Sequence, residues 1–331
     1  MPYGGKAVFL RLREGSLLDN LLYSLNASIP VFIVIIAGWF FRQKGMLTEQ
    51  FVTVANKFNF KVTLPILLFM DISSMNLREV FHWQFVLFCM VATTICFFVT
   101  WIFAKRFLSS EMVGSFVQGS FRGSAAVLGV AFMTNIYGDA GLAPLMIIGC
   151  VPLYNIYSVI VLTIESNEDK PKQGQIKTAL VNICKNPLII GILLGVIVAL
   201  LPFQLPDMVN KTLSSFSDMA TPLALIAIGA AFEGKKALAK IRPTLVASLI
   251  KLVVQPLVFL SIAVWLGFRN QELIAFLIML GAPSTASSYI MAKNMGNDDV
   301  LSASIIVVTT LLSAITITGW LFLLKSLSLI A

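Results

Sequence analysis

Residues 273 to 296 read LIAFLIMLGAPSTASSYIMAKNMG, an apolar run that stops abruptly at Gly281. Pro283 lacks a backbone N–H and crowds the preceding turn, and Gly281 tolerates non-helical backbone. Ser284 and Thr285 place hydroxyl groups directly after the proline. The stretch therefore predicts a helix that breaks near its middle and presents polar groups at the break.

The composition indicates that this broken helix lies in a membrane. Of the 331 residues, 58% are hydrophobic and 12% are charged, whereas soluble domains have about 25% charged residues. Apolar runs of about 20 residues, long enough to cross a bilayer as helices, occur along the whole chain. We predict an all-α polytopic membrane protein with ten transmembrane helices at about 18–41, 48–72, 83–104, 112–136, 140–165, 177–201, 206–232, 239–267, 272–295 and 298–325.

The net charge of +8 is explained by the bilayer rather than by nucleic acid. The basic residues gather in alternate short connections, and the positive-inside rule assigns these connections to the cytoplasm. This pattern predicts a multi-pass protein of the plasma membrane, such as a bacterial inner membrane, with both termini on the extracytoplasmic side. The connections contain Arg42, Lys44, Lys105, Arg106, Lys170, Lys172, Lys235, Lys236, Lys240 and Arg242.

Proline and glycine positions repeat along the chain. Pro65 and Pro222 are 157 residues apart (222 minus 65), and Gly123 and Gly281 are 158 apart (281 minus 123). Five spans per half is an odd number, so the two halves enter the membrane in opposite senses and form an inverted repeat. The predicted units are a first five-helix repeat, a cytoplasmic linker and a second five-helix repeat, at 16–165, 166–176 and 177–325.

The segment equivalent to the opening stretch reads GSFRGSAAVLG at 119–129. Arg122, Gly123 and Ser124 interrupt its apolar run, so helices 4 and 9 should both be broken and should cross. The N-termini of half-helices present free N–H groups and partial positive charge, which favours an anion. The alternative is that the small residues only permit close helix packing.

Arg122 strengthens the prediction of an anion site. An arginine in the middle of a span costs about 2.5–3.5 kcal/mol on insertion scales, so it needs a cavity or a partner. Its planar guanidinium suits a carboxylate. The other interpretation places Arg122 near the interface, where its side chain extends to the headgroups.

Other polar residues fall within the predicted spans. Asn26 and Asn155 either contact substrate or bond to a neighbouring helix. Lys61 and Asp218 occupy equivalent positions of the predicted repeat, because 218 minus 61 is 157. They form a buried ion pair, or Asp218 carries a coupling proton, or both side chains lie on helix faces in contact with water. Lys251 is a further charge within a span, and the sequence assigns it no role.

In order and spacing, several stretches resemble the auxin efflux carrier family, which includes bacterial dicarboxylate carriers and the plant PIN proteins. The resemblance covers about residues 18 to 325. It rests on NKFNFKVTLPILLF, FRGS, PLYNIYSV, NPLIIGILLG, MATPLALIAIGAAF and GAPSTAS. One departure is Ser124, because family members commonly have Asn after FRG and often a proline a few residues later.

The resemblance implies a fold similar to that of bile acid sodium symporters, with ten helices in two inverted repeats. Spans one, two, six and seven would form a scaffold that often dimerises, and the other spans would form a transport domain that moves like an elevator. Lys61 and Asp218 would then belong to the scaffold. Family substrates are mostly small organic anions.

The leading hypothesis is therefore a secondary carrier for a mono- or dicarboxylate, with Arg122, Gly123, Ser124, Pro283, Ser284, Thr285, Asn155 and Asn26 at the site. Alternatives are a membrane sensor that binds the same ligand without transport, and a cation- or proton-coupled symporter of the bile acid type. A single histidine, four scattered cysteines and the lack of clustered acids argue against an enzyme, a metal site and a cofactor.

Overall fold

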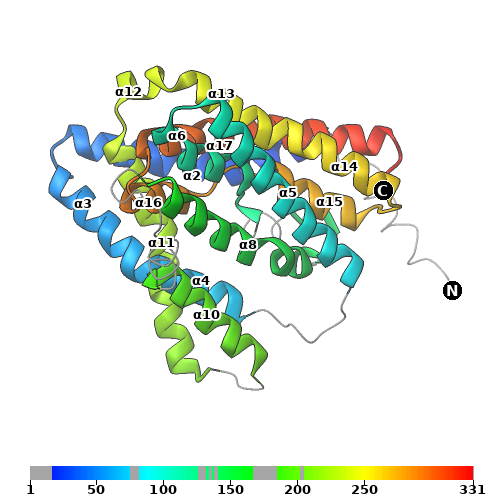
Figure 1. The fold of residues 1–331 in the computed structure, drawn as a ribbon, viewed down its shortest axis with the longest axis horizontal. Helices are drawn as coiled ribbons and strands as arrows, with labels where there is room; N and C mark the ends of the chain where they lie inside the picture. The colour runs from blue at the N-terminus through cyan, green and yellow to red at the C-terminus, as the bar shows by residue number, and fades with distance from the viewer. Residues whose placement is uncertain are drawn as a thin grey trace.

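The computed structural model describes residues 17–74, 82–125, 132–133, 136–137, 141–166, 185–201 and 205–330, with side chains from residue 29 onward. In this part of the chain all regular structure is helical, which confirms the all-α prediction (Figure 1). The elements are α2 (Leu17–Gln43), α3 (Glu49–Phe58), η1 (Asn59–Thr63), α4 (Leu64–Ser73), α5 (Trp83–Phe107), α6 (Ser110–Phe121), α8 (Ala143–Ile164), α10 (Pro187–Leu200), α11 (Asp207–Ala231), α12 (Gly234–Ala239), α13 (Ile241–Leu249), η2 (Ile250–Val254), α14 (Gln255–Trp265), α15 (Gln271–Gly281), α16 (Ala286–Asn294) and α17 (Asp299–Ser326).

Six helical stretches among the described residues are long and apolar enough to cross a membrane, so the protein is a multi-pass membrane protein. Two shorter apolar helices accompany them, at Ile29–Gln43 and Pro187–Leu200. The arrangement of ten spans in two inverted repeats stays a prediction. The six long stretches are Trp83–Phe107, Ala143–Ile164, Asp207–Ala231, Ile241–Trp265, Gln271–Asn294 and Asp299–Ser326.

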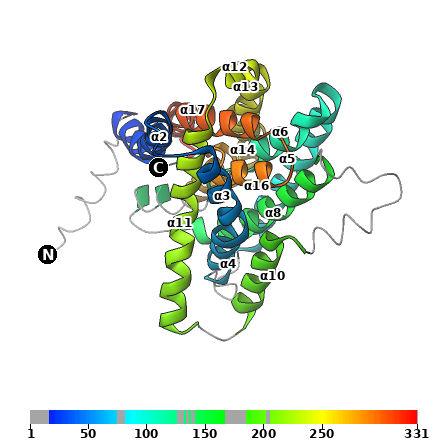
Figure 2. The same ribbon diagram turned by 90° about the vertical axis from the view of Figure 1, so that its left-hand side faces the viewer.

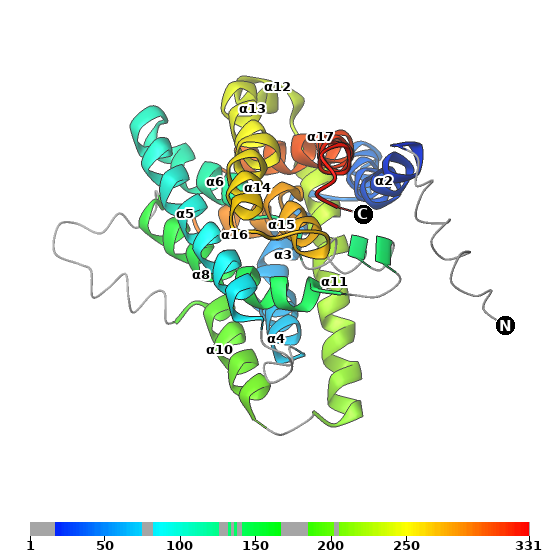
Figure 3. The same cartoon turned by 90° about the vertical axis from the view of Figure 1, so that its right-hand side faces the viewer.

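Two helix pairs form the most extensive packing in the molecule, α2 with α11 and α10 with α4. Glycines bring the backbones together in both pairs. A Cβ on Gly229 of α11 would overlap the carbonyl oxygen of Ile35 in α2, and one on Gly191 of α10 would overlap the carbonyl oxygen of Pro65 in α4. Figures 2 and 3 show α4 lying between α10 and α11, so these helices form one continuous body.

Two π-helical segments, η1 and η2, each lie directly before a helix that has proline in its first turn. Pro65 and Pro256 cannot donate a backbone hydrogen bond and crowd the turn before them, and a widened turn accommodates this. The same widening alters which side chains face inward. Asn59 of η1 and Lys251 of η2 are both fully buried.

The half-helix α15 lies at the centre of the core. Every residue from Leu273 to Gly281 is buried, and the helix packs against α14, α17, α8, η2 and α5 (Figure 3). Aromatic rings support it from α5, where Phe85 stacks on Phe276 at 4.7 Å between ring centroids. The end of α15 at Gly281 is therefore held firmly, and this end carries one side of the site.

Candidate substrate-binding site

Two interrupted helices approach the centre of the molecule. Helix α6 ends at Phe121, and residues 122–124 are not helical. Helix α15 ends at Gly281, residues 282–285 are not helical, and α16 begins at Ala286. Both interruptions occur where the glycine and proline positions predict them.

The two interruptions touch each other. The backbone N–H of Ser124 donates to the carbonyl oxygen of Pro283, with 2.9 Å between nitrogen and oxygen. Gly123 lies close to the same chain segment, since a Cβ on Gly123 would lie 3.0 Å from the carbonyl oxygen of Ala282. Segments about 160 residues apart in sequence thus form one structural unit, and the unwound backbone is buried in protein as a membrane interior requires.

A cavity of about 220 Å³ opens beside this contact. One wall comes from α2, α4 and α11, and the other comes from the two interruptions with α8 and α17. Most of the lining is apolar, with polar groups concentrated near the interruptions. The polar lining residues are Asp71, Arg122, Ser124, Tyr154, Asn155, Thr221, Ser284, Thr285, Ser287 and Thr310.

Arg122 lies at the boundary between α6 and the cavity, with 5% of its surface exposed. Its Nη2 donates to Ser287 Oγ at 2.8 Å, and its Nη1 approaches Met291 Sδ at 3.1 Å. The guanidinium therefore rests over the first turns of α16. This position excludes the interpretation in which Arg122 extends to the membrane surface.

Three buried polar atoms of the cavity lining have no hydrogen-bond partner among the described residues. They are Arg122 Nε, Asn155 Oδ1 and Ser284 Oγ. Buried polar groups in proteins are almost always bonded, so unpaired polar atoms on residues that line one cavity indicate a place for a ligand or for water. The positively charged guanidinium of Arg122 and the hydroxyl of Ser284 can both donate hydrogen bonds to a carboxylate.

Hydroxyl groups extend the polar surface along the start of α16. Thr285 Oγ1 lies 2.8 Å from Ser287 Oγ and 3.3 Å from Ser288 Oγ. The backbone N–H of Ser284 donates to Thr309 Oγ1 of α17 at 3.1 Å. The first turn of α16 thus has its N-terminal end at the cavity, where the helix dipole favours negative charge.

The structure brings most of the predicted site residues together. The cavity is lined by Arg122, Gly123, Ser124, Asn155, Pro283, Ser284 and Thr285. Asn26 belongs to α2, but its side chain lies outside the described residues.

Of the alternatives for Lys61 and Asp218, the buried pair is wrong, because both side chains are exposed and neither lines the cavity. The buried polar contact between η1 and α11 uses Asn59 instead, whose Nδ2 donates to the carbonyl oxygen of Ala220 at 2.9 Å. Lys61 points outward because it lies two residues further along the helical turn.

Asp71 is the charged cavity residue that sequence reasoning missed, beside the uncharged Tyr154, Thr221, Ser287 and Thr310. It lies near the end of α4 and lines the same cavity as Arg122. An available signal was its place in the apolar run LPILLFMDIS, where a carboxylate needs a partner or a cavity as much as an arginine does.

Comparison with known proteins identifies the family of this chain. Residues 23–321 match the family described as membrane transport protein. An uncharacterized transporter of Methanocaldococcus jannaschii is 24% identical over 309 residues, covering 90% of this chain and 99% of that protein. A proposed malonate transporter of Rhizobium meliloti is 23% identical over 280 residues, covering 82% and 86%. The chain therefore belongs to this family of membrane transport proteins, that of the auxin efflux carriers.

Proposed function

We propose that the protein is a secondary carrier that moves a small organic anion with one or two carboxylates across the plasma membrane. The observation that carries this proposal is the buried Arg122, which lines a cavity beside two touching helix interruptions and whose Nε has no hydrogen-bond partner in the described part of the chain. A carboxylate would satisfy this donor together with the hydroxyl of Ser284. The malonate named for one relative belongs to the same chemical class.

The position of the cavity supports alternating access of the elevator type. The tightly packed helices α2, α4, α10 and α11 serve as the scaffold, and the interrupted helices with their neighbours serve as the transport domain. The cavity lies between these two groups, so a sliding movement of one against the other would carry a bound anion from one side to the other. A homodimer through the scaffold helices would hold the scaffold still in the bilayer.

Uptake of labelled malonate and malate into proteoliposomes tests the proposal. Arg122→Ala removes the charge and should lower uptake by about tenfold to a hundredfold, as expected for the loss of hydrogen bonds to a charged group. Arg122→Lys keeps the charge without the planar fork and should retain part of the activity.

Arg106→Ala is the matched control, because Arg106 is an exposed arginine at the end of α5. Unchanged uptake by Arg122→Ala would remove Arg122 from the site. Ligand-induced stabilisation of the wild type without any flux would favour the membrane sensor over the carrier.

A further inference from the structure

Lys251 is a fully buried cation behind the touching interruptions. Its Nζ donates to the carbonyl oxygen of Phe121 at 3.3 Å and to that of Met279 at 3.2 Å. Phe121 is the last residue of α6, and Met279 lies in the last turn of α15. One ammonium group therefore joins the C-terminal ends of both half-helices that lead into the crossing.

These helix ends need a positive charge. The last carbonyl groups of a helix lack partners within the helix and carry partial negative charge. Two such ends converge at Lys251, and among the described residues no carboxylate forms an ion pair with it. The counter-charge of this buried ammonium is thus supplied by backbone carbonyl oxygens, the same ligand type that coordinates alkali cations in selectivity filters.

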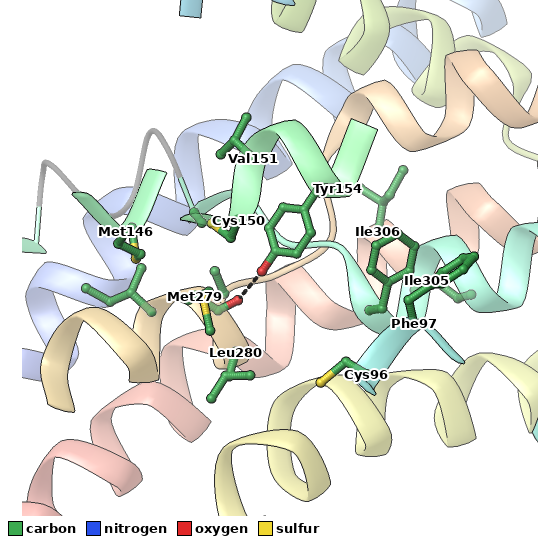
Figure 4. Packing of buried hydrophobic residues seen from close by; sticks show 14 of the residues in the cluster. Cys96, Phe97, Met146, Cys150, Val151, Tyr154, Met279, Leu280, Ile305 and Ile306 are labelled. Atoms are coloured by element: carbon green, nitrogen blue, oxygen red, sulfur yellow. Dashed lines mark hydrogen bonds between the residues drawn. The ribbon is translucent and has the colours of Figure 1, made fainter. Parts of the chain in front are cut away.

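Tyr154 completes the surroundings of the ammonium. Its hydroxyl donates to the carbonyl oxygen of Met279 at 2.8 Å, as Figure 4 shows, and its ring centroid lies 5.8 Å from Lys251 Nζ. The aromatic face and the shared carbonyl both favour a cation at this place. Tyr154 also lines the substrate cavity, so it connects the lysine to the site.

Gly123 provides the room for the lysine. A Cβ on Gly123 would lie 3.0 Å from Lys251 Nζ and 3.1 Å from Lys251 Cε. In the sequence FRGS, the arginine thus lines the cavity while the next residue leaves space for a second cation behind it. The residue type at 123 and the presence of Lys251 are structurally linked.

We propose that Lys251 is a positioning residue that acts as a covalently attached cation in a carbonyl site between α6 and α15. Its ammonium takes the place of a free alkali metal cation, so the crossing keeps its shape without bound sodium or potassium. The inference rests on the proposed carrier function for its link to transport. The carbonyl site itself is testable on the purified protein without any flux measurement.

Two variants separate the charge from the packing of the side chain. Lys251→Ala empties the carbonyl site and leaves space, whereas Lys251→Met keeps the length of the side chain without the charge. Melting of each purified protein is measured in choline chloride, in sodium chloride and in methylammonium chloride. Uptake of labelled malonate is measured in proteoliposomes with the same three salts.

We expect the melting temperature of the wild type to be independent of the salt. The melting temperature of Lys251→Met should also not change between the three salts. Lys251→Ala should melt lower in choline and be restored by methylammonium or sodium, which enter the emptied site. Both variants should lose about tenfold or more of malonate uptake in choline, and only Lys251→Ala should be rescued by the small cations.

Three results would overturn the proposal. The first is full uptake activity of Lys251→Met, and the second is wild-type uptake that requires sodium. The third is a Lys251→Ala protein that no small cation stabilises, which includes failure to purify this variant in every salt. A wild type that transports none of the carboxylates would instead count against the carrier function. In that event the melting of Lys251→Ala would still decide whether the carbonyl site accepts a cation.

Discussion

The two glycines at the interruptions occupy equivalent sequence positions but have different surroundings. A Cβ on Gly123 would lie 3.0 Å from both the Ala282 carbonyl oxygen and Lys251 Nζ. A Cβ on Gly281 would meet side-chain atoms of Pro256 and Leu277 at 3.4 and 3.5 Å, which is ordinary packing. The interruption of the first half therefore has the stricter requirement for glycine.

This difference predicts unequal effects of alanine. Gly123→Ala should destabilise the protein by about 1–3 kcal/mol, since backbone or lysine must shift to accept the methyl group. It should also reduce malonate uptake. Gly281→Ala is the matched control and should melt close to the wild type. Melting curves and uptake of both variants check the prediction, and equal behaviour of the two would contradict it.

At the site, the sequence predicted a functional side chain only where a polar or charged residue interrupts an apolar run. Arg122 stands out because a charge interrupts an apolar run beside a glycine. Lys251 stands out equally, but its partners are backbone carbonyl oxygens of two other helices, which no residue pattern reveals. Asp71 interrupts an apolar run in the same way, but it lies near the end of its helix, where a carboxylate can also reach the membrane surface, so the three-dimensional arrangement was needed to place it in the cavity.

At the scale of elements, the predicted sequence repeat would relate the two glycine-lined helix pairs. A shift of 157 residues carries Gly38 to Gly195 (195 minus 38). A Cβ on Gly38 of α2 would overlap the Ile226 carbonyl oxygen of α11, and one on Gly195 of α10 would lie 3.0 Å from the Phe69 carbonyl oxygen of α4. If the predicted inverted repeat holds, the pair of α2 with α11 corresponds to the pair of α10 with α4.

Substitution of Gly229 tests the close approach in the first of these pairs. Gly229→Ala places a methyl group against the backbone of Ile35 and should cost about 3 kcal/mol or more, because two helices must separate. Gly319→Ala in α17 is the control, since nothing lies within 4 Å of its added Cβ and alanine favours the helix. A thermal melt in which both variants match would contradict the packing argument.

The helix breaks were predictable from the sequence, but the π-helices were not. Pro283 and Gly123 mark interruptions because each has a direct effect on backbone geometry. The prolines at positions 65 and 256 predict only some local distortion. Whether the turn before them widens depends on what the rotated side chains meet, and here Asn59 finds the Ala220 carbonyl oxygen in α11.

At the scale of the whole molecule, the distribution of basic residues predicts the orientation in the membrane. The stretch Ile241–Trp265 is long and apolar enough to cross the bilayer, and it lies between two exposed positions, Lys235 before it and Arg269 after it. Lys235 belongs to the basic connections assigned to the cytoplasm. A cysteine at 235 should therefore react only from inside the cell and a cysteine at 269 only from outside.

Labelling with a membrane-impermeant maleimide measures this orientation in intact and in permeabilised cells. Lys235→Cys should be labelled only after permeabilisation, and Arg269→Cys in both samples. Cys89, Cys96 and Cys150 are buried, so a Cys184→Ser background suffices as the control. Labelling of Lys235→Cys in intact cells would indicate the opposite topology, with the termini in the cytoplasm.

The two buried cations of the crossing have an electrical consequence. Arg122 and Lys251 both belong to the group of helices proposed to move, whereas Asp71 belongs to α4 of the scaffold. A dianionic cargo would cancel the two charges, and the loaded movement would then be nearly insensitive to voltage. The empty return would carry the charges uncompensated through the field, at about 2.3 kcal/mol per charge for each 100 mV. Membrane potential would thus act mainly on the unloaded half of the cycle. It would determine which side of the membrane the empty site faces at rest.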